Sequence, residues 1–250
     1  MANSLSYDGN DLADYNLIIS SPGDNRLNQI VSRVQLQDNG YPFRPQREPR
    51  RLAIDFHVTG TSRANLDSNL DNIKRLLIQL TPQQLIFDSI STRYFLAILE
   101  SFDGQYRSPI HFRGAMQFIC PDPLGYSTTE TTSTHAIDAN PKTITEAIGG
   151  SAFLKPTYVL TAGETLSSVT LLINNLTTIE ELSIASLSMT SGQVLTIDTA
   201  LWTVTLEGAA HMSNVTGKFP RLEPQLTNSI KLTAFGTLGS MDIIYREAYL

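Results

Sequence analysis

Apolar and polar residues alternate along several short stretches of the chain, the pattern of a strand with one buried face. The clearest stretch covers residues 51–60, where every second side chain is apolar: Leu52, Ile54, Phe56 and Val58. Similar stretches predict further strands at residues 17–20, 28–36, 84–90, 94–102 and 110–120. We therefore expect the first half of the protein to be mainly β.

Residues 62–80 follow a different period, with apolar residues at the spacing of one helix face. These residues are Leu66, Leu70, Ile73, Leu77 and Leu80. Thr61 or Ser62 can cap the start of the helix. Pro82 ends it, because proline disfavours the α conformation in the residue before it. The pattern thus predicts one α-helix among strands.

A polar stretch at residues 127–134 (STTETTST) follows the turn-rich segment 121–126 (PDPLGY) and is the best candidate for a domain boundary. Beyond it the pattern predicts only strands, at residues 143–148, 157–160, 166–174, 178–184, 193–198, 201–207, 229–234 and 240–245. Many short strands without a helical period are typical of a β-sandwich. We expect domains at residues 1–130 and 131–242, with an apolar last segment, 243–250, that is packed rather than free.

Residues 37–51 (QDNGYPFRPQREPRR) combine three prolines with the only basic cluster, Arg44, Arg47, Arg50 and Arg51. Proline at this density favours an extended loop. The loop could be a docking arm whose arginines pair with acidic groups of a neighbouring subunit. The cluster could instead contact DNA, although its acidic neighbours weaken this interpretation. It could also be a merely solvated loop.

Charge and composition narrow the classes of function. The 250 residues include 18 Lys plus Arg and 24 Asp plus Glu, a formal net charge of −6, and neither half has the basic excess that duplex DNA binding needs. Only 17% of residues are charged, against roughly 25% in typical soluble domains, which suggests that neighbours cover part of the surface. We expect no membrane span and no signal peptide, and the single cysteine, Cys120, fits a reducing cytoplasm.

Candidate chemistry is sparse. The four histidines lie in four separate segments: His57, His111, His135 and His211. None has a neighbour at metal-ligand spacing, and no nucleophile elbow or phosphate-binding loop occurs. Only Asp55 and Glu100 lie within apolar strands, and both are expected on the polar face rather than in a glycosidase cleft. We predict no catalytic residue, no cofactor and no metal, and therefore not an enzyme.

Four segments of the chain, at residues 5–12, 51–80, 118–127 and 217–224, resemble in order and spacing the motifs of siphophage distal tail proteins. Residues 5–12 (LSYDGNDL) look like the family's F-x-Y-N-G-x-D-L start, and residues 118–127 (FICPDPLGYS) look like F-x-C-x-D-P-x-G-Y-S at the domain junction. Residues 51–60 and then 66–80 resemble its strand, Gly turn and helix, and residues 217–224 (GKFPRLEP) resemble G-x-F-P-x-L-x-P-G-x-N. The chain departs from the last motif at residues 225–228 (QLTN), where Gly-x-Asn is usual.

The resemblance implies a mainly β, two-domain structural virion protein of the minimal form, without an inserted carbohydrate-binding module. Its N-terminal domain would be a β-sandwich or split-barrel-like fold with one α-helix, forming a hexameric ring, and its C-terminal domain a galectin-like β-sandwich. The ring would be assembled in the host cytoplasm and lie at the virion tail tip. It would join the tail tube to the tail tip or baseplate and leave a channel for DNA, which passes without specific binding.

The partners implied by the resemblance are further copies of the chain, the tail tube protein and a tail-tip protein, with the tape measure protein as a further candidate. In relatives the C-terminal segment, here residues 243–250, returns to the first domain. Two alternative functions remain open. A host-glycan-binding adhesin would use an exposed aromatic, and Trp202 is the only Trp, although its sequence context favours packing in the core or at its rim. A tail-associated glycan hydrolase is the other alternative, and no residue can be named for it.

Overall fold

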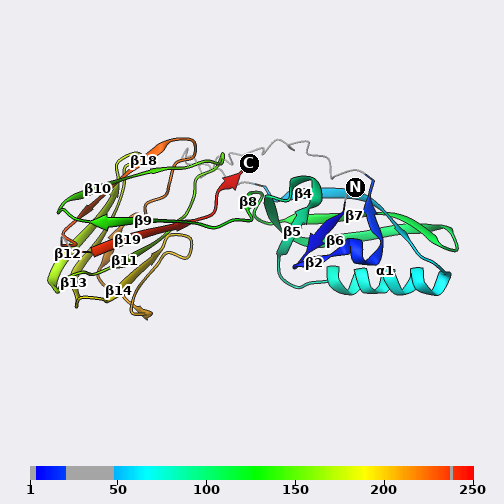
Figure 1. Ribbon diagram of the computed structural model, residues 1–250, viewed down its shortest axis with the longest axis horizontal. Coiled ribbons are helices and arrows are strands. Elements are labelled where there is room, and N and C mark those ends of the chain that lie inside the picture. The colour runs from blue at the N-terminus through cyan, green and yellow to red at the C-terminus, as the bar shows by residue number, and fades with distance from the viewer. Residues whose placement is uncertain (1–3, 21–47, 237–238) are drawn as a thin grey trace, which may run out of the picture. The chain divides into compact units, whose positions relative to one another are not determined.

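The computed structural model describes residues 4–20, 48–236 and 239–250. The chain divides into two compact units, Met1–Thr128 and Thr129–Leu250, coloured from blue to green and from green to red in Figure 1. The division falls inside the polar stretch at residues 127–134. The described residues are mainly in β-strands, as the hydrophobic pattern predicted.

The strands of the first unit pair antiparallel in the order β2-β1-β5-β6-β7-β4-β3, and β8 pairs with β6. Their bounds are β1 Leu5–Tyr7, β2 Asn10–Asp11, β3 Leu17–Ile19, β4 Arg50–Thr59, β5 Gln83–Phe87, β6 Arg93–Ser108, β7 His111–Cys120 and β8 Gly125–Ser127. β6 is long enough to pair with β5 through Ala97 and with β7 from Ile98 onward. β4 and β7 pair without a break over the whole of both strands.

Helix α1 (Arg63–Leu77) packs on one face of this sheet (Figure 1). Its buried side chains belong to one apolar core with alternate residues of β4 and β7: Leu66, Leu70, Ile73 and Leu77 with Leu52, Ile54, Phe56, Val58, Phe112, Met116 and Phe118. The predicted cap is confirmed, because the backbone N–H of Asn65 donates to Oγ of Ser62 at 3.2 Å. The predicted core residues of the helix are therefore correct up to Leu77.

The end of the helix was predicted wrongly. Leu80 continues the apolar spacing, yet α1 ends at Leu77 and the side chain of Leu80 is 98% exposed. The chain has to leave the helix to reach β5 at Gln83, and Pro82 already excludes the α conformation from the residue before it. Apolar spacing locates the buried face of a helix but does not by itself locate its end.

Other boundaries also differ from the predictions. The strand predicted at 84–90 ends at Phe87, and Asp88–Ile90 form a 3-10 turn. β6 continues beyond the predicted end at Phe102 to Ser108, because backbone pairing with β7 holds residues that lack an apolar pattern. Residues 131–134, predicted as linker, begin β9. The predicted strand at 28–36 and most of the Pro-rich loop lie outside the described residues.

The second unit contains two sheets, with strand orders β10-β18-β12-β13-β17 and β16-β15-β14-β11-β19-β9. The bounds are β9 Thr131–Ile137, β10 Lys142–Ala147, β11 Thr157–Thr161, β12 Leu166–Asn175, β13 Glu180–Met189, β14 Val194–Asp198, β15 Thr203–Leu206, β16 Ala209–Ala210, β17 Val215–Gly217, β18 Thr227–Thr233, β19 Gly239–Tyr245 and β20 Ala248–Tyr249. Alternate apolar residues are buried in both sheets, such as Ile230 and Leu232 on β18 and Tyr158 and Leu160 on β11. The unit is thus a β-sandwich, as predicted.

The last residues of the chain are held by the second unit. The backbone N–H groups of Ser151 and Ala152 both donate to the carbonyl oxygen of Ala248, at 2.9 and 3.1 Å. The N–H of Leu250 donates to Oγ of Ser151 at 2.8 Å. The segment is packed, as its apolar character indicated, while its return to the first domain stays a prediction.

Candidate functional site

The four arginines predicted to contact another subunit do not all lie on a loop. Arg44 and Arg47 lie outside the described residues. Arg50 and Arg51 are the first residues of β4, so the strand begins where the Pro-rich loop was expected to end. An intersubunit contact through these arginines stays a prediction.

Arg50 and Arg51 both have partners within their own chain. Arg51 forms a bidentate pair with the exposed Glu100, with Nε–Oε2 and Nη2–Oε1 distances of 3.2 Å each. The guanidinium of Arg50 lies over the ring of Phe95, 5.3 Å from its centroid, and burial lowers the pKa of Arg50. Of the two, Arg51 is the more accessible, and exposed pairs of this kind contribute little stability.

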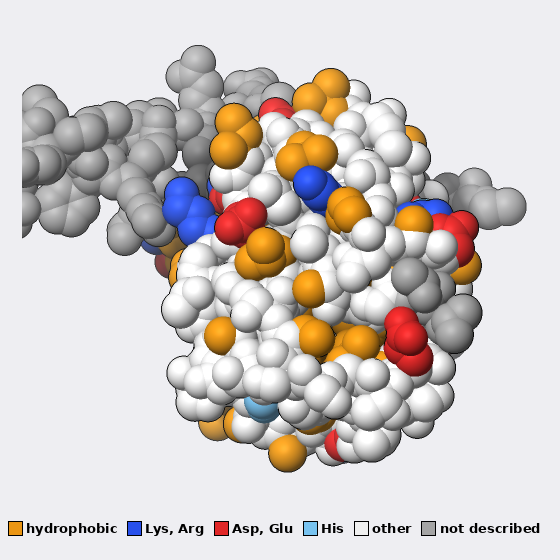
Figure 2. Space-filling model, turned by 90° about the vertical axis from the view of Figure 1, so that its left-hand side faces the viewer, with side chains coloured by type: hydrophobic (Ala, Val, Ile, Leu, Met, Phe, Trp, Pro, Cys, Tyr) orange, Lys and Arg blue, Asp and Glu red, His pale blue; other side chains and the backbone are white. Residues whose placement is uncertain are grey.

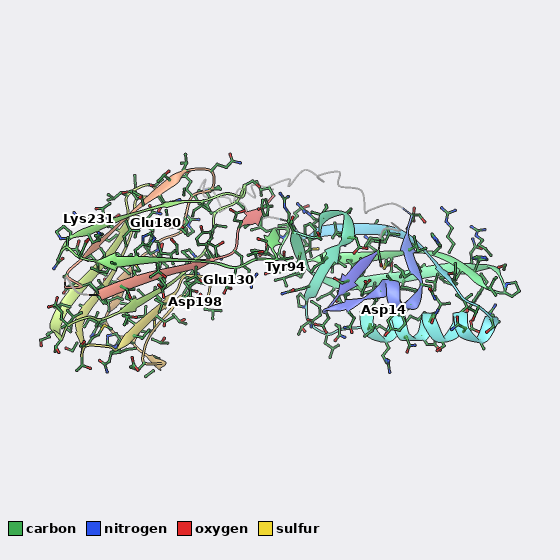
Figure 3. All side chains as sticks on the ribbon, viewed as in Figure 1. Asp14, Tyr94, Glu130, Glu180, Asp198 and Lys231 are labelled. Carbon is green, nitrogen blue, oxygen red and sulfur yellow. The ribbon has the colours of Figure 1, made fainter. Side chains whose placement is uncertain are left out.

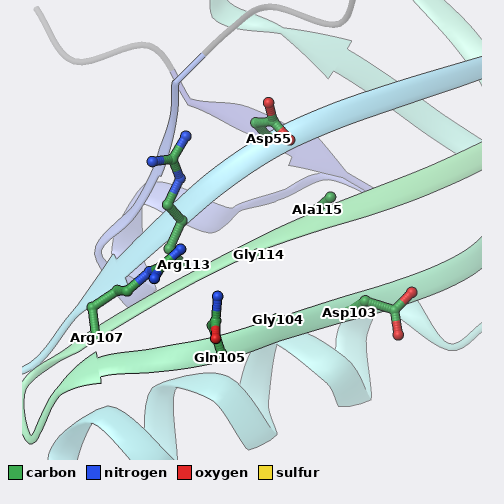
Figure 4. A pocket seen from close by; sticks show the side chains of 8 residues that line it. All are labelled: Asp55, Asp103, Gly104, Gln105, Arg107, Arg113, Gly114 and Ala115. Atoms are coloured by element: carbon green, nitrogen blue, oxygen red, sulfur yellow. The ribbon is translucent and has the colours of Figure 1, made fainter.

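The face of the first unit's sheet opposite α1 carries the polar side chains of β4, β7 and β6 and is hollowed into an open groove of about 620 Å³. The groove is lined by Asp55, Asp103, Gly104, Gln105, Arg107, Arg113, Gly114 and Ala115 (Figure 4). Gly104 and Gly114 are direct neighbours in the β6–β7 register. A Cβ on Gly114 would lie only 2.2 Å from the carbonyl oxygen of Asp103, so this close approach requires glycine.

The charged side chains of this groove balance one another in sign, and none of them is paired within the described part of the chain. It contains two carboxylates, Asp55 and Asp103, and two guanidinium groups, Arg107 and Arg113. Within the described part of the chain none of these four side chains makes a hydrogen bond or an ion pair. Asp55 and Asp103 both lie beside Ala115 in the sheet register, so the two like charges occupy one row. The sequence did not indicate this groove, because β6 was expected to end at Phe102.

Two other carboxylates, Glu146 and Glu180, are buried, each 7% exposed. Asp55 and Glu100, the acids considered from the sequence, are exposed on the polar face, as expected. Each acid lies on the buried face of its strand, in alternation with apolar residues: Glu146 with Ile144 and Ile148, and Glu180 with Leu182 and Ile184. Only the fold brings distant partners to them.

Glu146 on β10 joins the two sheets of the sandwich. Its Oε1 accepts from the hydroxyl of Tyr245 at 3.0 Å, and its Oε2 accepts from Oγ of Ser133 at 2.9 Å. Nε2 of His135 lies 3.1 Å from the same Oε2 and 3.0 Å from Oγ of Ser133. In a catalytic relay the serine and the acid contact different nitrogens of the histidine. The triangle formed here is therefore a structural polar cluster.

Glu180, which is labelled in Figure 3, lies at the start of β13 and is paired with Arg221. Arg221 donates from Nη2 to Oε1 at 2.7 Å, and its backbone N–H donates to Oε2 at 3.0 Å. Burial alone would raise the pKa of Glu180, but the hydrogen bonds and charge of Arg221 outweigh it, so that this pKa is lowered. The pair fastens the loop before β18 to β13.

Trp202 lies at an exposed rim and not in the core. Trp202 is 59% exposed, and the centroid of its ring lies 6.0 Å from the centroid of the Phe219 ring. Its φ of +60° is in the left-handed region, where bulky residues are rare. Oδ1 of Asp198 shapes the turn by accepting from the N–H groups of Ala200 and Leu201, at 2.8 and 2.9 Å. Of the two packing modes expected for Trp202, the structure supports the rim.

Among residues 4–20, 48–236 and 239–250, no group of three His, Cys, Asp or Glu side chains is placed to hold a metal ion. Within the same ranges, no helix is long and apolar enough to cross a membrane.

The motif at residues 5–12 builds a tight hairpin. Asp8 and Gly9 connect β1 to β2 with φ values of +51° and +75°, as a two-residue turn with matching twist requires. The buried Tyr7 fixes this hairpin to the core, since its hydroxyl donates to the carbonyl oxygen of Ala97 at 3.0 Å. The motif therefore has a structural purpose.

The motif at residues 118–127 forms the turn that leads out of β7. Oδ1 of Asp122 accepts from the N–H of Leu124 at 3.1 Å, and Oδ2 accepts from the hydroxyl of Tyr126. Cys120 is buried, and burial raises the pKa of its thiol to about 11. This thiol is therefore an unreactive part of the core.

The motif at residues 217–224 is a loop fixed to β13. Gly217 has a φ of +97°, and a Cβ there would lie 2.3 Å from the carbonyl oxygen of Glu181. Gln225, where the family pattern has glycine, takes a φ of +59°. Gln225 thus adopts the left-handed conformation that glycine reaches most easily.

Proteins with a similar fold are found among solved structures. A scan against protein-family models and a search of curated protein sequences each find no match. Among solved structures, the chain is similar to the Dit protein (gp 19.1) of phage SPP1, described as a paradigm of the hub adsorption apparatus in phages that infect Gram-positive bacteria. The TM-score is 0.78 at 18% identity, with 100% of both chains covered.

Two structures of the phage P2 baseplate in its activated conformation, one with calcium and one with strontium, also contain similar chains. Their TM-scores are 0.54 and 0.51 at 12% and 11% identity, with 99% and 97% of this chain and 98% and 97% of those chains covered. The chain therefore has the siphophage distal tail protein fold that its four motifs predicted.

Proposed function

We propose that this protein is a structural component of a phage tail hub, located at the virion tail tip between the tail tube and the tip or baseplate. The observation that carries the proposal is the likeness to the SPP1 Dit protein over the full length of both chains. Likeness to chains of a phage P2 baseplate supports the same class of assembly.

In this proposal six copies form a closed ring through the first unit, and DNA passes through the ring without specific binding. A closed ring uses heterologous contacts, in which two different surfaces of each copy meet. The net charge of −6 favours passage over retention of DNA. The second unit presents a docking surface to other tip proteins, and the tape measure protein is a further candidate partner.

The proposed protein has no catalytic activity. A glycosidase needs two carboxyl groups that face each other across its cleft. Figure 4 shows the two groove acids, Asp55 and Asp103, pointing in different directions. The buried acids, Glu146 and Glu180, are occupied by partners in their own unit.

Native mass spectrometry and negative-stain electron microscopy of the full chain test the ring. We expect particles of six copies of the 27.6 kDa chain, or twelve if two rings stack, with a central opening. Monomers at micromolar concentration, with no ring even after tail tube protein is added, would contradict the proposal.

A host-glycan-binding adhesin is the second candidate, and the exposed ring of Trp202 favours it. Sugar rings stack on exposed aromatic faces, and Phe219 adds a second ring beside Trp202. A glycan array with the wild type and with Trp202→Ala separates the two functions. Binding that depends on Trp202 supports the adhesin, whereas a silent array supports the scaffold alone.

A further inference from the structure

The strand through which the chain enters the second unit, β9, buries very little apolar surface. Its burial alternates along the strand, and the three inward positions are Ser133, His135 and Ile137. Of these only Ile137 is fully buried, at 2% exposure. The neighbouring strand β19, in contrast, has three buried apolar or aromatic side chains: Met241, Ile243 and Tyr245. Apolar packing alone therefore holds β9 weakly.

β9 is also the last strand of its sheet. The strand order ends in β11-β19-β9, so β9 is held on one side by its ladder with β19, which runs over all seven residues. Local opening takes less free energy where few apolar contacts are lost than in a buried core strand. The entry strand is thus the part of this sheet that is easiest to detach.

Glu146 holds β9 from the opposite sheet of the sandwich. This acid lies on β10 and is buried. Its Oε2 accepts from Oγ of Ser133 at 2.9 Å and lies 3.1 Å from Nε2 of His135, so one oxygen contacts both polar inward positions of β9. Its Oε1 accepts from the hydroxyl of Tyr245 on β19 at 3.0 Å. Hydrogen bonds to a charged acceptor that is removed from water are stronger than those between neutral groups.

We propose that Glu146 is a latch for β9, and that β9 becomes part of the linker when the latch opens. Residues 131–134 have the polar composition of a linker, and they form the first half of β9. Opening hydrates the buried carboxylate, which offsets part of the lost hydrogen bonding. Detachment of the seven residues adds about 24 Å of extended chain to the connection between the units. The latch thus sets how much chain joins the second unit, the proposed docking surface, to the first.

The positions of the donors distinguish a latch from a general contribution to the stability of the sandwich. Ser133 lies on β9, so loss of its contact with Glu146 frees this strand alone. Tyr245 lies on β19, which is paired on both sides, with β11 and with β9. Loss of the Tyr245 hydroxyl therefore weakens the sheet as a whole. The two donors bind the same carboxylate, which makes them a matched pair for an experiment.

Hydrogen exchange of the full chain, followed by mass spectrometry, measures the opening of β9. In Ser133→Ala the exchange rate of a peptide covering residues 129–138 should rise about tenfold, because a hydrogen bond to a charged group is lost. Peptides covering β11 and β14 should keep the wild-type rate. Ser133→Thr retains the hydroxyl and should exchange like the wild type. Tyr245→Phe should raise exchange in β9, β11 and β14 together.

Glu130→Gln is the control for a contact at the same end of the strand. Glu130 precedes β9 and forms an exposed ion pair with Arg246 at 3.4 Å. Exposed pairs contribute little stability, so the exchange rate of β9 should change less than about twofold. A change as large as that in Ser133→Ala would mean that the buried carboxylate has no special part in holding β9.

Native-state proteolysis gives a second measurement, because its product reports a detached β9 directly. Thermolysin cleaves before apolar residues, and Ile137 is buried while β9 is paired. Cleavage follows the population of the open form when opening and closing are fast. The cut before Ile137 should therefore also become about tenfold faster in Ser133→Ala. Mass spectrometry of the fragment that ends at Ala136 measures this rate.

The outcomes distinguish the latch from the proposed function. If β9 exchanges equally fast in Ser133→Ala and in the wild type, the contact with Glu146 does not hold the strand. If β9, β11 and β14 all exchange faster in Ser133→Ala, Ser133 supports the whole sandwich and the latch is wrong. The latch is also wrong if β9 of the wild type exchanges as fast as an unstructured peptide. Exchange does not depend on assembly, so a chain that forms no ring contradicts the proposed function alone.

Discussion

The two units of this protein differ in whether their charged side chains are paired within the chain. In the second unit, the buried acids are paired within the fold: Glu180 with Arg221, and Glu146 with Tyr245. Figure 2 shows one face of this unit, which is mainly uncharged, with scattered hydrophobic side chains. In the first unit, the groove on the polar face keeps acids and arginines without partners in the described chain.

This difference indicates where each unit makes its contacts. A buried charge without a partner is costly, so pairing inside the second unit serves its own stability. An exposed charge is solvated, and pairing it adds little to the stability of the fold. The charged side chains of the first unit are therefore available for contacts with another chain. Electrostatic complementarity sets the register and specificity of an interface more than its affinity. The polar side chains of the first unit are thus expected to matter for assembly, and those of the second for folding.

Breaking the Glu180–Arg221 pair should have the largest effect on stability. Arg221→Met leaves Glu180 buried without its partner, and we expect a loss of about 2–3 kcal/mol in the second unit. Arg51→Met, which breaks the exposed pair with Glu100, is the matched change in the first unit and should cost less than about 1 kcal/mol. Hydrogen exchange followed by mass spectrometry reads each unit separately. Equal losses in both variants would remove the contrast.

Acid should weaken the second unit through the same pair. The pKa of Glu180 is lowered in the folded state from its ordinary 4.5, so its contribution is complete above that value and is lost as pH falls through the folded pKa. Urea unfolding of the second unit, repeated at falling pH below 4.5, should show this loss in the wild type. Arg221→Met should show a shallower dependence on pH. Parallel curves for the two proteins would contradict this explanation.

Two tyrosines give a smaller test of the same contrast. Tyr245→Phe removes the buried hydroxyl that donates to Glu146, and we expect a loss of about 1.5 kcal/mol in the second unit. Tyr106→Phe removes the exposed hydroxyl that donates to Asp67 in the first unit and should change stability by less than about 0.5 kcal/mol. Urea midpoints of both variants check the order. A larger loss for Tyr106→Phe would reverse it.

Trp202 should have the smallest effect, of opposite sign. Trp202→Gly relieves a left-handed backbone conformation at an exposed residue, and we expect the second unit to gain up to about 1 kcal/mol. Thermal unfolding followed by circular dichroism measures the change. Such a gain means that Trp202 does not serve the fold, which sharpens the case for a surface role. A clear loss would mean that its contact with Phe219 is structural.

Much of the local structure could be predicted from the amino-acid sequence, because local structure depends on nearby residues. Alternation placed Leu52, Ile54 and Phe56 in the core, and the helix spacing identified the buried face of α1. The motif segments form turns whose geometry needs glycine or a capping side chain. The fold can therefore be recognised from the residues of these turns. That is why the distal tail protein fold could be predicted from the sequence, at only 18% identity to a solved structure.

Only the tertiary structure decided which distant side chains meet. Glu180 and Arg221 lie 41 positions apart. Alternation with Leu182 and Ile184 places Glu180 on the buried face of β13, but no local pattern indicates that this arginine neutralises it. The polar groove was missed for a related reason. Residues 103–107 of β6 have no apolar alternation and are held by backbone pairing with β7, which depends on the partner strand rather than on their own side chains. Apolar patterning reports burial, whereas charge pairing and strand edges are properties of the assembled sheet.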